Sequence, residues 1–280
     1  MKTRSVFKVL EGEEVMEGAG VKLRRIFGFG DTTLTDPFLL LDNFGSDDPD
    51  DYTAGFPWHP HRGIETVTYM LEGVVEHGDS LGNSGVITNG QVQWMTAGSG
   101  IIHQEMPQAY DGTMRGFQLW VNLPRSHKMT PPRYRDIKAE DLPSVKGKGW
   151  EMKLVCGAYG GAEGPARDIV LKPWFFDVKA EPGAEFALEV RPEDNVLCLV
   201  FEGSGSFEKG GKALKPGQLA VLRNGDHVSC AAGARGMRFM LMAGRPLGEP
   251  VAWRGPIVMN TEEELVTAFR EYRDGTFIKK

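Results

Sequence analysis

The sequence has few cysteines and no long apolar run. Its three cysteines, Cys156, Cys198 and Cys230, form no C-x-x-C pair and lie mostly among apolar residues. We therefore expect buried thiols in a reducing compartment. No stretch resembles the roughly 20 consecutive apolar residues of a membrane-spanning helix, and the amino terminus mixes charged with apolar residues, unlike a secretory signal. These features predict a cytoplasmic protein, or a nuclear one in a eukaryote.

Positive charge is also scarce. The 32 Lys and Arg against 38 Asp and Glu give a formal net charge of −6, and the isoelectric point is near 5.6. A surface that binds phosphate backbones needs clustered Lys and Arg, so this balance argues against direct nucleic-acid binding. The 280 residues, 41% of them hydrophobic, are enough for one large or two ordinary globular domains.

Short apolar runs separated by turn residues predict an all-β protein, since the chain contains 36 glycines and 17 prolines. The pair Asn89-Gly90 is a two-residue hairpin signal before the strand "QVQWM". One short helix is predicted near the carboxyl terminus, where Asn260 or Thr261 caps an acidic first turn and Gly275 ends the apolar pattern.

Four of the six histidines lie between residues 56 and 107. Alternate residues of a strand share one face, so His59 and His61 form one convergent pair and His103 and Glu105 a second. On neighbouring strands the two pairs can share one divalent ion, and three imidazoles with one carboxylate leave room for substrate or dioxygen on a six-coordinate ion. The alternative is that these are surface or core histidines satisfied by ordinary hydrogen bonds.

Two neighbours of this motif qualify the interpretation. His77 lies in "EHGDS", which is typical of a polar turn, and is set aside. Pro60 separates His59 from His61 and cannot donate to a sheet ladder, so it is expected at a sheet edge, with His59 at the mouth of the site.

The second half of the chain repeats the first in weakened form. "LEG" at Leu71–Gly73 is followed by "GQVQWM", and "FEG" at Phe201–Gly203 is followed by "GQLAVL". Aligning the Gly-Gln turns places Cys230 and Ala232 opposite the second ligand pair, so this copy has lost its ligands. We predict a metal-binding domain over residues 1–130, a polar linker with several prolines over 131–149, and a second domain without ligands over 150–280.

Longer strings resemble a known family. "HPHRGIETVTYMLEG", with "PFLLLDNF" before it and "QWMTAGSGIIHQEMP" after it, closely resembles the pirin family of the cupin superfamily, over essentially the whole chain. This resemblance implies a bicupin, two antiparallel β-barrel or jelly-roll domains, with a metal, usually iron, in the amino-terminal one. The residues that match the pirin ligands are His59, His61, His103 and Glu105.

The sequence departs from the general cupin pattern at Glu65. This residue occupies the place of the usual cupin carboxylate ligand, whereas in pirins the residue matching Glu105 takes that role. Two interpretations of Glu65 follow: it orients a ligand histidine from behind, or it pairs with Arg62 or another cation.

The ligand set suits Fe, Mn, Co, Ni, Cu or Zn, and the resemblance implies Fe(II). Several pirin-like proteins are quercetin 2,3-dioxygenases, so the resemblance implies that dioxygen cleaves a flavonol such as quercetin, with loss of carbon monoxide. Glu105 is then the expected catalytic residue, a ligand and also the base for the flavonol 3-hydroxyl. Trp94, Phe117 and Trp120 are candidates for an aromatic pocket, or are ordinary core residues.

A different class of function is also open. Some pirins are non-catalytic, iron-dependent transcriptional co-regulators that act through protein partners, and Lys22, Arg24 and Arg25 are candidates for such a surface or form a solvated strand face. A sugar isomerase is less favoured, because no basic cluster for a sugar phosphate accompanies the motif.

Overall fold

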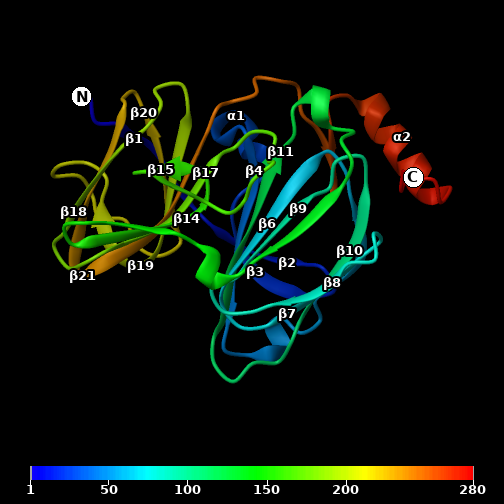
Figure 1. Cartoon of the computed structure of the whole chain (residues 1–280), viewed down its shortest axis with the longest axis horizontal. Helices are drawn as coiled ribbons and strands as arrows, with labels where there is room; N and C mark the ends of the chain where they lie inside the picture. Colours follow the sequence, from blue (N-terminus) through cyan, green and yellow to red (C-terminus); the bar gives the residue numbers. More distant parts are fainter. Residues whose placement is uncertain (1, 280) are drawn as a thin grey trace. The chain divides into compact units, whose positions relative to one another are not determined.

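The structure is a computed structural model that describes residues 2–279, and β-strands dominate it (Figure 1). The all-β prediction is confirmed. The chain forms two compact units. Unit 1 consists of Met1–Gly12, Thr35–Pro37 and Glu140–Pro246, and unit 2 of Glu13–Leu34, Phe38–Ala139 and Leu247–Lys280.

These units interleave in sequence, unlike the continuous blocks that the sequence predicts. Strand β1 (Ser5–Glu11) pairs with β20 (Gln218–Arg223) in unit 1, and the segment after residue 246 belongs to unit 2. The predicted linker contains β12 (Arg133–Ile137) and β13 (Ser144–Gly147), which are edge strands of two different sheets. A sheet edge accepts a strand from any part of the chain, so local patterns do not reveal these pairings.

Unit 2 contains a seven-stranded and a four-stranded sheet. The larger has the order β12-β9-β6-β11-β4-β3-β2, in which the other six strands are β9 (Val92–Thr96), β6 (Ile64–Glu72), β11 (Met114–Asn122), β4 (Phe38–Ser46), β3 (Val21–Phe27) and β2 (Glu13–Glu17). The smaller has the order β5-β10-β7-β8, with bounds Phe56–His61, Ile101–Pro107, Val75–Asp79 and Ser84–Ile87. Figure 1 shows β4, β6, β9 and β11 running side by side.

Apolar residues from strands of both sheets pack together in unit 2. One cluster joins Ile64 and Met95 of the larger sheet to Ile101 of the smaller, and a second joins Met70 to Val75. Strand β6 is buried along its first seven residues, as expected for a central strand covered on both faces. This packing fixes the two sheets of the unit against each other and positions the residues between them.

The turn at Asn89-Gly90 does not close a hairpin. The strands on either side of it, β8 and β9, belong to different sheets, so the turn carries the chain from one layer of unit 2 to the other. Gly90 has a φ of +77°, and the Asn89 side chain accepts a hydrogen bond from the Gly73 amide at 2.7 Å. The local turn chemistry is therefore as predicted, whereas the pairing is not.

The predicted carboxy-terminal helix is present as α2 (Glu262–Arg273). Thr261 is its N-cap, and Glu264 completes a capping box with it. Before it lie the short strands β22 (Ala252–Arg254) and β23 (Ile257–Met259), and the other α-helix among the described residues is the four-residue α1 (Thr32–Thr35). Neither helix has the length and apolar character needed to cross a membrane.

Unit 1 is built on an eight-stranded sheet. Its path is β1-β20-β19-β21-β17-β14-β13, with β18 paired to β21. The bounds of the strands not yet given are β14 (Trp150–Cys156), β17 (Trp174–Ala180), β18 (Glu185–Glu189), β19 (Asn195–Ser206) and β21 (His227–Gly244), and β15 (Ala158–Tyr159) and β16 (Ala162–Glu163) form a separate pair. Cys230 and Ala232, at the positions expected for lost ligands, lie in the apolar core. All three cysteines are buried free thiols.

Candidate metal centre

Three histidines converge between two neighbouring strands of unit 2. Strands β5 and β10 pair antiparallel, with His103 opposite His59 and Ile101 opposite His61. Because the first two histidines alternate on β5, their rings reach the same side, and one ligand nitrogen from each of the three residues lies within 4.8 Å of the others. Strand β5 is an edge strand, which is where Pro60 is tolerated.

Backbone carbonyls orient two of the rings. His59 Nδ1 lies 2.8 Å from the Pro57 carbonyl oxygen and His61 Nδ1 lies 3.1 Å from that of Pro256. A carbonyl only accepts, so each Nδ1 carries the proton, and the two Nε2 atoms face each other at 3.1 Å with lone pairs. Two lone pairs at this distance repel unless a cation lies between them. Metal-bound imidazoles commonly donate their other N–H in this way.

The third ring is the most deeply buried. His103 is 0% exposed, and neither of its ring nitrogens has a hydrogen-bond partner among the described residues. Its centroid lies 4.4 Å from that of His59 and 5.0 Å from that of His61. An unpaired buried imidazole is costly, and coordination of an ion would satisfy it. The residues therefore fit a divalent metal ion.

Electrostatics favours the metal-binding form of these rings. Burial holds the pKa of His61 well below its usual value, and the neighbouring His59 adds to the effect. Burial likewise lowers the pKa of His103, with further contributions from the charges of His61, His59 and His77. Neutral imidazole is the form that binds a metal, so these rings need not lose a proton first.

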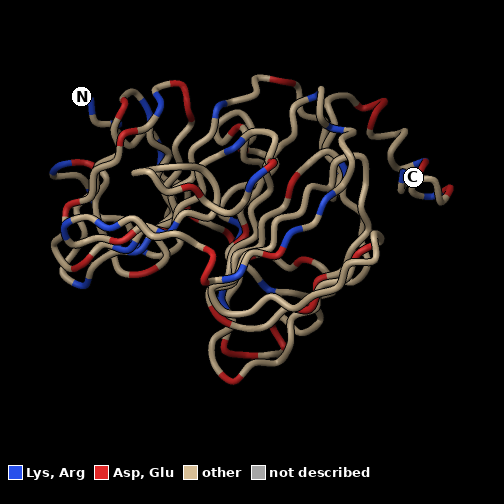
Figure 2. Tube along the Cα trace, in the orientation of Figure 1, with Lys and Arg blue, Asp and Glu red and all other residues tan. Residues whose placement is uncertain are grey.

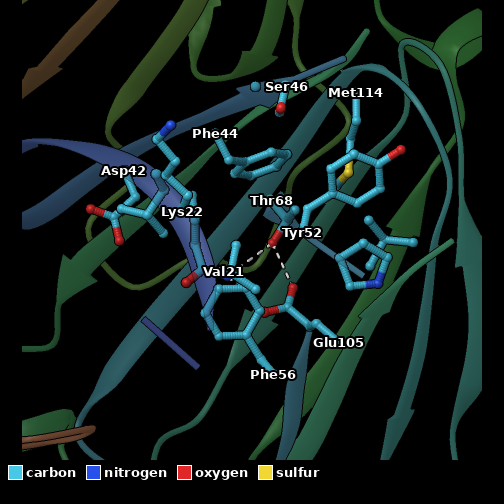
Figure 3. A pocket seen from close by; sticks show the side chains of 15 residues that line it. Val21, Lys22, Asp42, Phe44, Ser46, Tyr52, Phe56, Thr68, Glu105 and Met114 are labelled. Carbon is cyan, nitrogen blue, oxygen red and sulfur yellow. Dashed lines mark hydrogen bonds between the residues drawn. The ribbon is translucent and has the colours of Figure 1, made fainter. Parts of the chain in front are cut away.

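Glu105, the fourth predicted ligand, is not part of the three-residue cluster. Its Oε1 accepts a hydrogen bond from Thr68 Oγ1 at 3.0 Å, and its Oε2 accepts one from Gln118 Nε2 at 2.7 Å. The pairing of β10 with β5 shifts register between His103 and Glu105, and such irregularities re-aim side chains. Figure 3 shows Glu105 and Thr68 together at the wall of a small cavity of about 30 Å³.

The interpretation of His77 as part of a polar turn is wrong. It lies in strand β7, 4% exposed, with its ring stacked on Tyr134 at 4.4 Å and 5.4 Å from that of His103. Its Nε2 lies 3.5 Å from Asp79 Oδ2. This polar segment forms a strand and not a turn, because β7 pairs with β10 and places His77 opposite Glu105.

Neither interpretation of Glu65 describes its contacts. Its Oε1 accepts a hydrogen bond from Thr96 Oγ1 at 2.7 Å, and the side chain is fully buried. Arg62 instead pairs with Glu271 at 2.7 Å and donates to the carbonyl oxygens of Ser99 and Phe277. These partners lie in the carboxy-terminal segment and in a turn, which no local pattern linked to Arg62.

A cavity of about 650 Å³ opens beside the histidines. Trp120 lines it with its ring 5.0 Å from that of His61 in an edge-to-face arrangement, and Trp253 lies 5.7 Å from both Trp120 and Phe29. Of the three predicted pocket aromatics only Trp120 lines this cavity. Trp94 and Phe117 are buried core residues, whereas the lining residues Phe29, Phe56 and Trp253 were missed. Phe29 and Trp253 lie in segments without a metal-type motif, and Phe56, although it begins the strand that carries His59 and His61, has no signal of its own.

The three residues of the predicted basic surface, Lys22, Arg24 and Arg25, have different environments. Arg25 lines the cavity and forms a bidentate pair with Asp42, at 2.9 and 2.8 Å, and a third bond of 2.7 Å to Glu17, whereas Lys22 and Arg24 are exposed. Figure 2 shows Lys and Arg interspersed with Asp and Glu along the chain. The basic residues of β3 therefore form no uniform positive surface.

Comparison with known proteins identifies the family. The pirin family model matches residues 20–121, and the model of the pirin C-terminal cupin domain matches residues 175–278. The chain belongs to the pirin family. The two domains of this pirin are cupins, as the sequence predicted.

Similar pirins and structures bear several names. A Pseudomonas aeruginosa protein named "Putative quercetin 2,3-dioxygenase" is 44% identical, with 97% of each chain covered. A "Pirin-like protein" of Caulobacter vibrioides is 43% identical over 99% of this chain and 100% of its own. A crystal structure of a quercetin 2,3-dioxygenase from Acinetobacter baumannii superposes with a TM-score of 0.90 at 33% identity, covering 99% of both chains. An Escherichia coli pirin in complex with nickel(II) shares the fold, with a TM-score of 0.67 at 20% identity over 85% of this chain and 98% of its own.

Proposed function

We propose that this pirin is a metal-dependent dioxygenase that cleaves flavonols such as quercetin, with Fe(II) as its metal. The observation that carries the proposal is the convergence of three imidazoles beside a cavity of about 650 Å³ with aromatic walls. A cavity of this size suits a small planar molecule. The names of the Pseudomonas and Acinetobacter relatives support the same reaction class.

The proposed ligands are His59, His61, His103 and Glu105. Nitrogen and oxygen donors of this kind suit several first-row metals, and the Escherichia coli pirin structure is a complex with nickel(II). A bound Fe(II) ion supplies Lewis acidity to a substrate hydroxyl and a redox partner for dioxygen. Each imidazole contributes a neutral donor, and the carboxylate reduces the net charge of the loaded site.

The chain's own residues have separate tasks in this proposal. Trp120 and Trp253 bind the flat faces or edges of the flavonol and exclude water around it. Glu105 takes the proton of the 3-hydroxyl, because a carboxylate is a proton acceptor and this one is hydrogen-bonded to Gln118, a residue that lines the cavity. The Arg25–Asp42 pair lies in the cavity wall, where it offers hydrogen-bonding groups to the remaining hydroxyls.

The test is anaerobic loading with Fe(II), followed by quercetin and air, with flavonol loss and carbon monoxide measured together. His103→Ala should abolish both signals, whereas His127→Ala, a substitution at an exposed histidine in the turn Arg125–His127, should retain them. Stoichiometric iron binding without product in the unsubstituted protein would overturn the dioxygenase proposal. The iron-dependent regulator acting through protein partners would then be the leading function.

A further inference from the structure

Gln118 connects the cavity wall to Glu105. This residue of strand β11 donates from Nε2 to Glu105 Oε2 at 2.7 Å, and its Oε1 accepts from Trp120 Nε1 at 3.2 Å. Trp120 is two residues further along the same strand and therefore on the same face. The amide thus lies between a cavity-lining indole and the carboxylate of Glu105.

The chemistry of the partners fixes which way the amide points. An indole N–H can only donate, so it requires the amide oxygen, and this leaves the amide NH₂ for the carboxylate. The opposite orientation would set the amide oxygen against Glu105 and the NH₂ group against the indole N–H. Both contacts would then be repulsive. The indole of Trp120 therefore determines that Gln118 acts as a donor towards Glu105.

A second donor completes the arrangement. Thr68 of strand β6 donates to the other carboxylate oxygen at 3.0 Å, so Glu105 of β10 is held from two strands of the opposite sheet. A carboxylate has about four lone-pair sites, and two donors leave sites free for a metal ion. Glu105 is also 5% exposed, so few other groups compete for these positions.

We propose that Gln118 is a positioning residue that holds the Glu105 carboxylate for metal binding, and that the indole N–H of Trp120 sets its amide orientation. This inference rests on the ligand set of the proposed function. Its consequence is that the metal site extends through one amide to the aromatic wall of the cavity. A residue of the wall then influences metal affinity without touching the ion.

The test measures the affinity for Co(II) alone, by competition with a chromophoric chelator. Gln118→Met keeps the side-chain length and removes the donor, and it should weaken Co(II) binding by about 10- to 100-fold, the usual effect of losing a hydrogen-bond partner of a metal ligand. Trp120→Phe should weaken binding to a smaller extent. In the Gln118→Met background the Trp120 substitution should add nothing, because the amide through which it acts is gone.

Two further proteins make the outcomes separable. Gln104→Met alters a neighbour of Glu105 that lies on the other face of β10, and should bind Co(II) like the unsubstituted protein. Glu105→Gln reports whether the carboxylate is a ligand at all.

If Glu105→Gln weakens binding while Gln118→Met does not, the positioning role is wrong and the ligand set stands. If Glu105→Gln has no effect, the ligand set itself fails. Additive effects of the Trp120 and Gln118 substitutions would overturn the coupling between them, and thermal unfolding of each variant checks that it is folded.

Discussion

Replacing Glu65 by Gln should stabilise the protein at alkaline pH. Glu65 is 0% exposed on strand β6, and burial raises the pKa of its carboxyl to about 7. The hydrogen bond from Thr96, the neighbouring Trp94 side chain and the charges of Arg133 and Arg135 act in the opposite direction without cancelling the effect of burial. The folded protein therefore favours the protonated acid, a form that glutamine imitates in shape and lacks in charge.

The direction and size of the change in stability with pH follow from the pKa values of Glu65 in the folded and unfolded states. In the unfolded chain the carboxyl has its usual pKa of 4.5, so between pH 4.5 and 7 the folded state keeps a proton that the unfolded state has released. The contribution of the protonated acid to stability is complete below pH 4.5 and is lost as the pH rises through 7. The difference between the pKa values corresponds to about 3 kcal/mol in the free energy of unfolding.

The assay compares urea unfolding of the two proteins at several pH values from 5 to 8, in the presence of a metal chelator. As the pH rises from 5 to 8, the free energy of unfolding of the Glu65→Gln protein should increase by about 2 to 3 kcal/mol relative to that of the unsubstituted protein. Glu76→Gln, at an exposed position of strand β7, serves as the control and should show no such trend. The comparison between proteins removes the contributions of other titrating groups.

A pH-independent difference between the two proteins would refute this reasoning. So would a Glu65→Gln protein that is the less stable of the two at pH 8. Either result would mean that the folded state accommodates the charged carboxylate, through contacts stronger than the cost of burying it.

Three other predictions concern unit 2. Arg62→Met should cost about 3 kcal/mol, because it removes a buried cation that pairs with the carboxy-terminal segment and lies 4.2 Å from the Phe277 ring centroid, and hydrogen exchange in α2 should increase. Gly63→Ala should lower the thermal midpoint more than Gly82→Ala, since both glycines have a positive φ but only at Gly63 would a methyl group overlap with a backbone carbonyl. Under the proposed function, Trp253→Ala should raise the KM for quercetin roughly two- to twelvefold in steady-state assays, with a smaller change in kcat, as expected for the loss of one aromatic contact.

The sequence alone predicted the parts that depend on local periodicity. Alternation along a strand gave the convergence of His59 and His61, and the spacing of capping residues gave helix α2. The two-domain β architecture followed from turn residues and from the repeated strings. Each of these features is encoded within a few residues, so it can be read before the chain is folded.

The tertiary structure decided what depends on segments far apart in the chain. The carbonyl of Pro256 orients His61 from 195 residues away, and the strands around the site bring Gln118 and Thr68 to Glu105. Burial of His77 was likewise decided by the tertiary structure, whereas its polar neighbours in the sequence had predicted a turn. The physical reason is that sheet pairing satisfies backbone hydrogen bonds with little regard to distance in sequence, so the partners of a side chain are set by which strands become neighbours.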